Sequence, residues 1–546
     1  MGVSVVLAVV ILVWAVLTVG LVVGWSSFER NPRLRTLALG AILALALAHM
    51  LMYSVVAEDA YISLRYSAQL ADGNGMVFNV GEKVEGYSNF LWVILVALPK
   101  VIVPGIDIVA VAAVLGVLCA LAAVFVAYVL VRRVSGSASA GLLAGTVIAA
   151  SGSFAGYGPS GLETPLFVLL VLLVLLMVWT KRPLWAGVLI ALATMTRPDG
   201  ALLAALLGVW LIWRAIRGRD TWRAALLYLA GAFVLAVPWT IWRVVYYGHL
   251  LPNAMAAKSG VGFDVLFASG WDYLLGFVGA TQALLLLIPV ALYELATRRN
   301  TEHDEARAVI WLVFGLAGAY IAFFVLAGGD WMPGFRFFAS AIPLLAVGIA
   351  ASWALSRATT SEWERGGLPK AGAVVAVSLA LLSIAVSATH PKMRPAFLAW
   401  DKTIKQLADT GAWLGRSLPP GAVMSTFANG ALTFEAGNDR MVVDQLGLTD
   451  EHIARKGKRN PEGLVGHQAY DDDYMVNVRK PDVMVTDGRG FLKAMVCAPA
   501  EVFAKDYQLA NFQVDDQWAF VYLRREKAPQ LLEALTKDPR FVYVPC

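Results

Sequence analysis

Charged residues are scarce in this sequence of 546 residues, which excludes an ordinary water-soluble globular protein. Asp, Glu, Lys and Arg together make up 15% of the chain, whereas hydrophobic residues make up 59%. Soluble domains are about one quarter charged and about half apolar. Apolar runs at residues 1–25 and 37–56 exceed the roughly 18 residues that cross a bilayer as a helix. The composition therefore predicts an all-α polytopic membrane protein.

Three further absences narrow the functional class. The sequence has no Walker loop, no dinucleotide-binding glycine motif and no zinc-ligand spacing, so ATP-driven transport is unsupported. The net charge of +5 requires no nucleic-acid partner, because the basic residues set topology and contact anionic membrane lipids. No Lys or Arg precedes the first apolar run, so we interpret this run as a retained anchor and not as a cleaved signal.

Cysteine is also rare, with three residues in the chain. Cys119 lies within a predicted span, whereas Cys497 and Cys546 lie in a C-terminal segment that we expect outside the cytoplasm. An oxidising compartment permits a disulfide between these two residues. Two free thiols are the alternative that the sequence leaves open.

Short basic loops alternate with loops that lack Lys and Arg, and this bias predicts the orientation. Cytoplasmic loops carry the positive excess. A span at residues 89–103 would break the alternation, so we expect an interfacial helix there. About twelve spans remain, or about thirteen if that segment crosses, in the cytoplasmic (inner) membrane of a bacterium. The basic clusters expected in the cytoplasm are residues 30–35, 132–133, 181–182, 214–223, 298–299 and 357–370. The extracytoplasmic loops expected are residues 58–87, 156–163, 196–200, 248–270 and 328–336.

The sequence predicts two domains, a transmembrane domain at 1–389 and an extracytoplasmic soluble domain at 390–546. From about residue 390 the chain becomes charged and is punctuated by Gly and Pro. Residues 400–414 have helical spacing, 422–426 and 441–443 are short apolar runs, and 482–486 resembles a buried strand. These elements predict an α/β domain.

An acidic pair, Glu58 and Asp59, stands where the second predicted span leaves the membrane. An ionised acid close to hydrocarbon is costly unless it faces a cavity or has a partner, so the pair is a functional hypothesis. The structural alternative is the start of a solvated loop.

The pair is followed by further motifs along most of the chain, and together they resemble a bacterial family of membrane glycosyltransferases. Near the pair they are Ala60-Tyr61-Ile62, Gly73-Asn74-Gly75 and residues 85–92 (EGYSNFLW). Later ones are residues 161–165 (GLETP), 196–200 (TRPDG), 252–253 (PN), 329–332 (GDWM) and 444–448 (DQLGL). The resemblance implies the GT-C fold, a helix bundle with an acidic motif in its first large external loop and a polyprenyl-phosphate sugar as donor.

Within that family, the sequence resembles the terminal arabinofuranosyltransferases of mycobacterial cell walls. This implies arabinofuranose as the sugar, inversion in a single displacement, and an arabinan or other cell-envelope glycan or glycoconjugate as acceptor in cell wall biogenesis. Glu58-Asp59 replaces the more usual Asp-Asp of these enzymes. The alternatives are a transporter or flippase of lipid-linked sugar, although no repeated halves are evident, and a non-catalytic binding relative.

The chemistry assigns roles to the candidate residues. Asp59 is the expected general base, because a carboxylate can accept the proton of a poorly nucleophilic hydroxyl. Glu58 would orient the acceptor, share the proton or help to hold a divalent cation. That cation, Mg²⁺ or Mn²⁺, is the one cofactor that the sequence leaves possible. We expect Arg65, Lys258 and Arg336 to bind the donor phosphate, with interfacial snorkelling as the alternative for each. The expected substrate-binding residues are Glu163, Arg197, Asp199, Asp330 and Trp331. A structural Arg197–Asp199 ion pair is the alternative for those two residues.

Reporter fusions test this topology. A reporter fused after Ala388 should be active outside the cytoplasm and one fused after Arg133 inside it, because the positive-inside bias places these sites on opposite faces. An external reading at Arg133 would mean that residues 89–103 cross the membrane.

Overall fold

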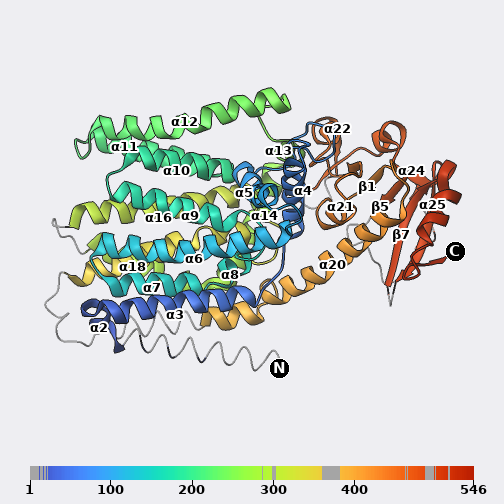
Figure 1. Ribbon diagram of the computed structural model, residues 1–546. Helices are drawn as coiled ribbons and strands as arrows, with labels where there is room; N and C mark the ends of the chain where they lie inside the picture. The colour runs from blue at the N-terminus through green and yellow to red at the C-terminus, as the bar shows by residue number, and fades with distance from the viewer. Residues whose placement is uncertain are drawn as a thin grey trace. The chain divides into compact units, whose positions relative to one another are not determined.

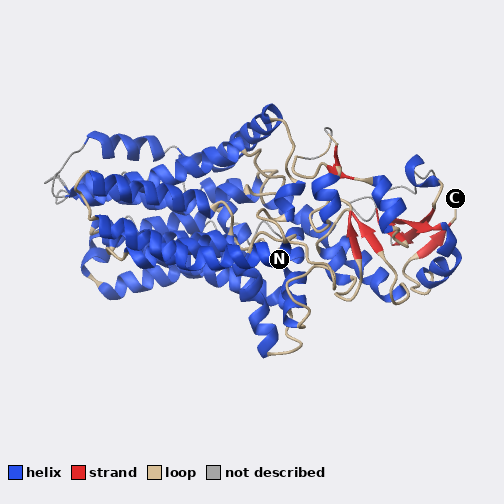
Figure 2. Ribbon diagram, turned by 90° about the horizontal axis from the view of Figure 1, so that it is seen from above, coloured by secondary structure: helices blue, strands red, loops and turns tan. Residues whose placement is uncertain are grey.

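The residues that the computed structural model describes are mainly helical, and strands occur among them only in the C-terminal part (Figure 2). It describes residues 12, 16, 20, 23–285, 287–297, 303–358, 382–460, 463, 465–485, 497, 500–514 and 517–545. Internal contacts divide the chain into two compact units, which do not follow sequence order. The predicted domain boundary at 389/390 stays a prediction.

The first unit, here the bundle unit, comprises Met1–Val55, Ala113–Trp239 and Phe263–Leu398. Its secondary structure is helical throughout the described residues (Figure 1). Helices α6, α12 and α20 also have residues in the second unit. The helices of the bundle unit are α2 (Trp25–Arg30), α3 (Pro32–Leu51), α6 (Ile108–Ser135), α7 (Ala138–Ala150), α8 (Gly152–Tyr157), α9 (Thr164–Trp179), α10 (Pro183–Thr196), α11 (Gly200–Ile216), α12 (Trp222–Tyr247), α14 (Phe263–Leu285), α15 (Leu287–Thr297), α16 (Asp304–Leu326), α17 (Arg336–Ala339) and α18 (Ile342–Ala358).

Several helices are long and apolar enough to cross a bilayer, which makes the chain a multi-pass membrane protein. Among the described residues these are α3, α6, α12, α16 and the stretch Arg336–Leu355, and shorter apolar helices accompany them. The first predicted span, residues 1–25, lies largely outside the described residues. The number of spans therefore stays a prediction.

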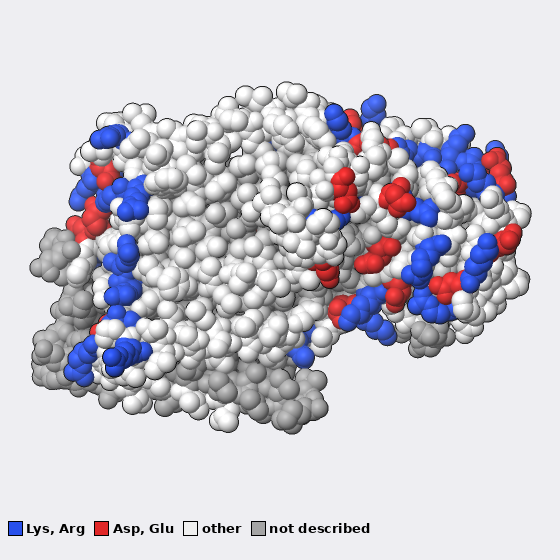
Figure 3. Space-filling view, in the orientation of Figure 1, with Lys and Arg blue, Asp and Glu red and all other residues white. Residues whose placement is uncertain are grey.

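Loops that the sequence places on the same side of the membrane do meet in the bundle unit. Lys181, in the turn between α9 and α10, pairs with Asp220 and with Glu305 at the start of α16. Elsewhere, Arg197 pairs with Glu163, which joins two loops expected on the other face. Figure 3 shows Lys and Arg gathered at one end of this unit beside a broad uncharged zone. The grouping agrees with the alternation, and the orientation in the membrane stays a prediction.

The second unit, here the mixed unit, comprises Val56–Ala112, Thr240–Gly262 and Ala399–Cys546. Its helices are α4 (Glu58–Ala71), α5 (Phe90–Ile102), α13 (Asn253–Ala257), α20 (Arg394–Ser417), α21 (Ala431–Glu435), α22 (Glu451–Lys456), α23 (Asp472–Tyr474), η3 (Met475–Arg479), α24 (Glu501–Ala504), η4 (Arg525–Lys527) and α25 (Ala528–Leu535). Its strands are β1 (Met424–Thr426), β2 (Val442–Asp444), β3 (Lys458–Arg459), β4 (Ala469–Tyr470), β5 (Val483–Val485), β6 (Tyr507–Val514), β7 (Gln517–Arg524) and β8 (Val542–Val544).

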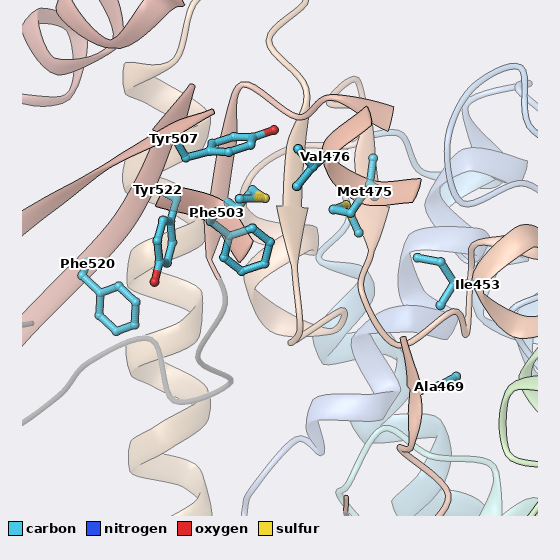
Figure 4. Packing of buried hydrophobic residues seen from close by; sticks show 10 residues of the cluster. Ile453, Ala469, Met475, Val476, Phe503, Tyr507, Phe520 and Tyr522 are labelled. Carbon is cyan, nitrogen blue, oxygen red and sulfur yellow. The ribbon is translucent and has the colours of Figure 1, made fainter. Parts of the chain in front are cut away.

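A mixed six-stranded sheet organises the C-terminal part, in the order β2-β1-β5-β7-β6-β8. β1 lies parallel to both β2 and β5, and the remaining pairs are antiparallel. One hydrophobic cluster of this part includes Met475, Phe503, Tyr507 and Tyr522 (Figure 4). After β1 the chain forms β2 on one side of β1, and it later forms β5 on the other side of β1. The carboxyl ends of parallel strands at such a reversal form a common place for a binding site.

The predicted helix at 400–414 lies within α20, and the predicted strand at 482–486 corresponds to β5, with residue 486 outside the described residues. The short apolar runs at 422–426 and 441–443 overlap β1 and β2. The short helix at 89–103 is α5, whose 13 residues extend about 20 Å, less than the roughly 30 Å of hydrocarbon. This length agrees with an interfacial helix. Cys119 is free and buried, and Cys497 is disulfide-bonded. The expected partner Cys546 lies outside the described residues.

Candidate active site

The acidic pair does not begin a loop, because Glu58 and Asp59 form the first turn of helix α4. Negative charge is stabilised at a helix N-terminus by the helix dipole. A carboxylate oxygen of Glu58 accepts a hydrogen bond from the backbone N–H of Gly430, at 2.6 Å. A Cβ on Gly430 would lie 2.0 Å from the Glu58 carbonyl oxygen and 2.5 Å from its carboxylate, so only glycine permits this approach.

The environment of Glu58 favours its neutral form. Burial and the neighbouring Asp59 carboxylate together raise the pKa of the Glu58 carboxyl to about 8, and the hydrogen bond from the Gly430 N–H opposes both effects. Glu58 and Asp59 also share a side-chain hydrogen bond. Two adjacent carboxyls that share one proton titrate as a pair. At neutral pH, Glu58 therefore holds a proton beside Asp59.

Arg65, one turn and a half further along α4, makes contacts different from those expected. It is fully buried, and its guanidinium donates to the carbonyl oxygens of Phe78, Thr433, Gly437 and Arg440 at 2.6 to 3.1 Å. Burial lowers its pKa to about 10, so it stays charged at neutral pH. The geometry gives no support to phosphate binding by Arg65, because its donors already serve the backbone. It holds α4 against the chain around α21.

Two asparagines join other parts of the mixed unit to β2 and to the segment after it. The Asn79 amide pairs with both backbone groups of Val442, at 2.8 and 3.0 Å, as a neighbouring strand would. The Asn253 amide donates to the carbonyls of Gly447, Leu448 and Asp450 at 2.8 to 3.2 Å. These contacts anchor the segment before α5 to the start of β2, and α13 to the loop after β2.

Asp444, the last residue of β2, is a buried acid close to the pair. It accepts from the backbone N–H groups of Leu446 and Thr449 at 2.8 and 2.7 Å and from the amide of Asn429. Burial raises its pKa to about 6, against the lowering effect of these hydrogen bonds. Its charge contributes to the raised pKa of Glu58. The carboxyl edge of β1 and β2 thus shapes the electrostatics of the acidic pair.

Lys258 follows α13 and is exposed. Its side chain passes the outer face of Gly466, at 3.7 Å from the place where a Cβ would be. An exposed ammonium on a flexible stem can reach a phosphate as a point charge. Phosphate binding by Lys258 stays a prediction.

In the bundle unit, Glu163, Arg197 and Asp199 form one buried ionic cluster. Arg197 lies 3.2 Å from the Glu163 carboxylate and 3.1 Å from the Asp199 carboxylate, and its guanidinium also lies over the rings of Phe167 and Phe337. Tyr320 donates to Asp199 at 2.6 Å. The structural pair considered for Arg197 and Asp199 exists, and substrate binding by these residues stays a prediction.

Asp330 and Arg336 form a second buried pair in the bundle unit, at 2.8 Å. Phe335 before Arg336 has φ of 58°, in the left-handed region that non-glycine residues rarely adopt. This turn starts α17 and directs Arg336 over the ring of Phe337, at 4.8 Å. Trp331 beside Asp330 is 38% exposed. An exposed indole next to an acid can stack on a sugar ring.

The predicted residues thus fall into four sets: the α4 residues, Lys258 after α13, the Arg197 cluster, and the Asp330–Arg336 pair with the neighbouring Trp331. Sequence reasoning did not propose Gly430 or Tyr320 as site residues, and Asp444 entered only as part of a motif. Within the described ranges, no three or more His, Cys, Asp or Glu side chains group together as metal ligands would. The divalent cation stays a prediction without a ligand set.

Glu58→Gln should change the pH dependence of stability. Burial, as the largest cause, raises the Glu58 pKa from 4.5 to about 8. Between these two pH values the folded chain keeps a proton that the unfolded chain releases, so the free energy of unfolding falls as pH rises from about 4.5 to about 8. The variant has no such proton, so its melting temperature should fall less from about pH 5 to pH 8. Melting curves in detergent measure this. Glu533→Gln, an exposed acid of α25, is the control, and equal slopes in all three proteins would refute the raised pKa.

The chain is similar to known proteins in sequence and in fold. Residues 398–530 match a family described as Domain of unknown function (DUF8728). The chain is 28% identical over 327 residues to a terminal beta-(1->2)-arabinofuranosyltransferase of Corynebacterium glutamicum, covering 51% of this chain and 45% of the relative. A Mycobacterium tuberculosis protein of the same name is 28% identical over 316 residues, with 51% and 49% covered. The chain spans about half the length of these curated relatives.

Among solved structures, ArnT from Cupriavidus metallidurans bound to undecaprenyl phosphate matches with a TM-score of 0.55 and 16% identity. The match covers 88% of this chain and 96% of that one. ArnT is a GT-C enzyme, and identity this low carries the fold alone. The chain therefore has the GT-C fold, and in sequence it is similar to terminal arabinofuranosyltransferases.

Proposed function

We propose that this protein is a membrane glycosyltransferase that moves a sugar from a polyprenyl-phosphate donor to a cell-envelope glycan. The observation that carries the proposal is the acidic pair at the start of α4, in which Gly430 fixes Glu58 and the environment keeps a proton on it. A pair of titratable groups whose environments differ is a common arrangement for acid and base chemistry.

Asp59 is the base in the proposed single displacement. An acceptor hydroxyl gives its proton to the Asp59 carboxylate while its oxygen forms a bond to the anomeric carbon of the donor. The bond from that carbon to the phosphate oxygen breaks, and polyprenyl phosphate leaves with the electron pair. Attack opposite the leaving group inverts the anomeric centre. A positioned general base supplies about 100- to 10,000-fold of the rate.

Neutral Glu58 supports this role because it leaves one negative charge on the pair instead of two. Its proton can be shared with Asp59 or donated to an acceptor hydroxyl, and the Gly430 N–H holds its other oxygen in place. Glu58 is therefore proposed as the residue that orients the acceptor.

The remaining residues are proposed for the donor. Lys258 of the mixed unit would bind a phosphate, since ionised donors make the strongest hydrogen bonds to phosphate oxygens. In the bundle unit taken by itself, Arg336 is proposed for phosphate, and Asp330 and Trp331 are proposed for a sugar. Both carboxylates of the Arg197 cluster already bind Arg197, so we assign Glu163 and Asp199 to holding Arg197 and the adjoining helix ends in place.

The sugar proposed is arabinofuranose, which the names of the two curated relatives support. The polyprenyl-phosphate donor is supported by the undecaprenyl phosphate named for the ArnT structure. With the proposed topology, the pair and the sheet would lie outside the cytoplasm of a bacterium. A flippase or a binding protein would move or hold the same lipid without transferring its sugar, so turnover separates the three functions.

Asp59→Asn should reduce transfer by at least about 100-fold, because the amide keeps the size of the side chain but cannot accept the proton. Transfer of radiolabelled arabinofuranose from polyprenyl phosphate by the purified chain in detergent is the measurement, with melting recorded in parallel. Glu58→Gln should be less severe, since the amide retains a donor. Wild-type turnover in a folded Asp59→Asn protein would remove Asp59 as the base, and absence of transfer by the wild type with every sugar donor tried would contradict the proposed activity.

Lys258→Met should weaken use of the donor without affecting folding. The side chain is exposed, so its charge can be removed at little cost to stability, and loss of a phosphate contact should raise the KM for the lipid donor several-fold. Lys456→Met, also exposed and in the same unit, is the matched control. An unchanged KM in the Lys258 variant would exclude this residue from the donor site.

A further inference from the structure

One cavity of the bundle unit lies at helix ends that the proposed reaction does not use. Its volume is about 690 Å³. Its walls come from the end of α9, the start of α10, the end of α11, the start of α12 and the start of α16. The short loops between these helices carry the basic residues from which the topology was inferred.

The acids in this cavity are already paired. The buried Arg214 lies 2.7 Å from Glu305 and also bonds Asp220, and Lys181 lies 3.2 and 3.3 Å from the same two carboxylates. Hydrogen bonds and charges from Arg214 and Lys181 lower the pKa of the Asp220 carboxyl, against the effect of burial. The two basic side chains thus balance the two carboxylates of this cavity.

Two cations remain in excess. Arg219 and Arg223 line the same cavity, and both are exposed. Across the described ranges, no acidic side chain forms a salt bridge with either guanidinium. A cavity with two unbalanced guanidinium groups attracts an anion, and guanidinium matches the oxygens of a phosphate in a bidentate manner.

The other walls of the cavity are apolar and aromatic. Trp179 and Trp210 line it together with Leu211 and Leu227. Tryptophan is enriched where a membrane protein meets the headgroup region, since its ring is apolar and its N–H is polar. Figure 3 shows the band of Lys and Arg at one end of this unit next to the uncharged zone expected to face lipid. The cavity therefore combines cationic groups that can bind a phosphate with an apolar surface that can contact acyl chains.

We propose that this cavity binds the headgroup of an anionic phospholipid from the leaflet on the basic side of the bundle, which is the cytoplasmic leaflet in the predicted topology. Arg219 and Arg223 hold the phosphate, and the tryptophans and leucines contact the glycerol and the first part of the acyl chains. Basic pockets between helices on the cytoplasmic side are known sites for such headgroups. The proposal is independent of the transfer reaction.

The experiment measures stabilisation of the full chain in detergent by added phosphatidylglycerol. Phosphatidylglycerol should raise the melting temperature of the wild type, whereas phosphatidylcholine, which has no net charge, should not. The double variant Arg219→Gln/Arg223→Gln should need roughly 10- to 30-fold more phosphatidylglycerol for the same shift in melting temperature. This factor is expected because each substitution removes one charge contact with the anionic lipid. Glycerol phosphate tests a free anion, and without acyl chains it should give no comparable shift.

Arg132→Gln/Arg133→Gln is the matched control, since it removes two exposed arginines from another basic loop of the same unit. This control should respond to phosphatidylglycerol as the wild type does. If the cavity double variant melts abnormally without lipid, the two single variants replace it, each with an intermediate response. The proposal is overturned by an equal response of the cavity variants and the wild type, by equal stabilisation with phosphatidylcholine, or by equal stabilisation with glycerol phosphate.

Discussion

The position of the acidic pair depends on hydrogen bonds between helix α4 and backbone groups far along the chain. The Glu58 carboxylate accepts from Gly430, the Arg65 guanidinium donates to carbonyls of residues 433, 437 and 440, and Gln69 donates to the Asn438 carbonyl. Each buried carbonyl that lost its partner would cost about 1–3 kcal/mol. These bonds fix the rotation of α4 about the helix axis and the position of α4 along that axis. They therefore also fix the direction of the Glu58 and Asp59 side chains.

The sheet positions the backbone groups that bind Glu58 and Arg65 of helix α4. Gly430 follows β1 by four residues, and Asp444 ends the parallel neighbour β2. Both belong to the carboxyl edge at which the connection of parallel strands reverses direction. The candidate active site therefore uses a general property of α/β sheets together with a helix that the sequence places beside the membrane.

Much of the fold could be predicted from sequence because it follows local patterns. Hydropathy gave the membrane bundle, and short apolar runs gave β1, β2 and β5. Strands β6 and β7 were not predicted, although residues 518–523 (WAFVYL) form an apolar run that agrees with the buried pattern of β7. Helix α4 was expected as a loop, because its acids and Arg65 are polar and only distant partners allow Arg65 to be buried.

The candidate site was predictable in its residue types but not in its partners. A pair of carboxyls beside a membrane is visible in sequence, whereas a backbone N–H or carbonyl has no residue type that identifies it. Arg65 was therefore assigned to a phosphate, and the ligands it actually has are carbonyl oxygens. Arg197 and Asp199 lie two residues apart, so their ion pair could be anticipated, but Tyr320 bonds Asp199 from a position 121 residues away and could not.

The separation between Glu58 and Gly430 also has a consequence for biosynthesis. The hydrogen bond that fixes Glu58 spans 372 residues of sequence. A ribosome makes roughly 5–20 residues each second, so α4 leaves the translocation machinery some tens of seconds before its partner exists. During that interval the two acids have neither the Gly430 N–H nor the carbonyl ligands of Arg65. The site is therefore completed only when the C-terminal part of the chain has folded, and nascent or truncated chains should not assemble it.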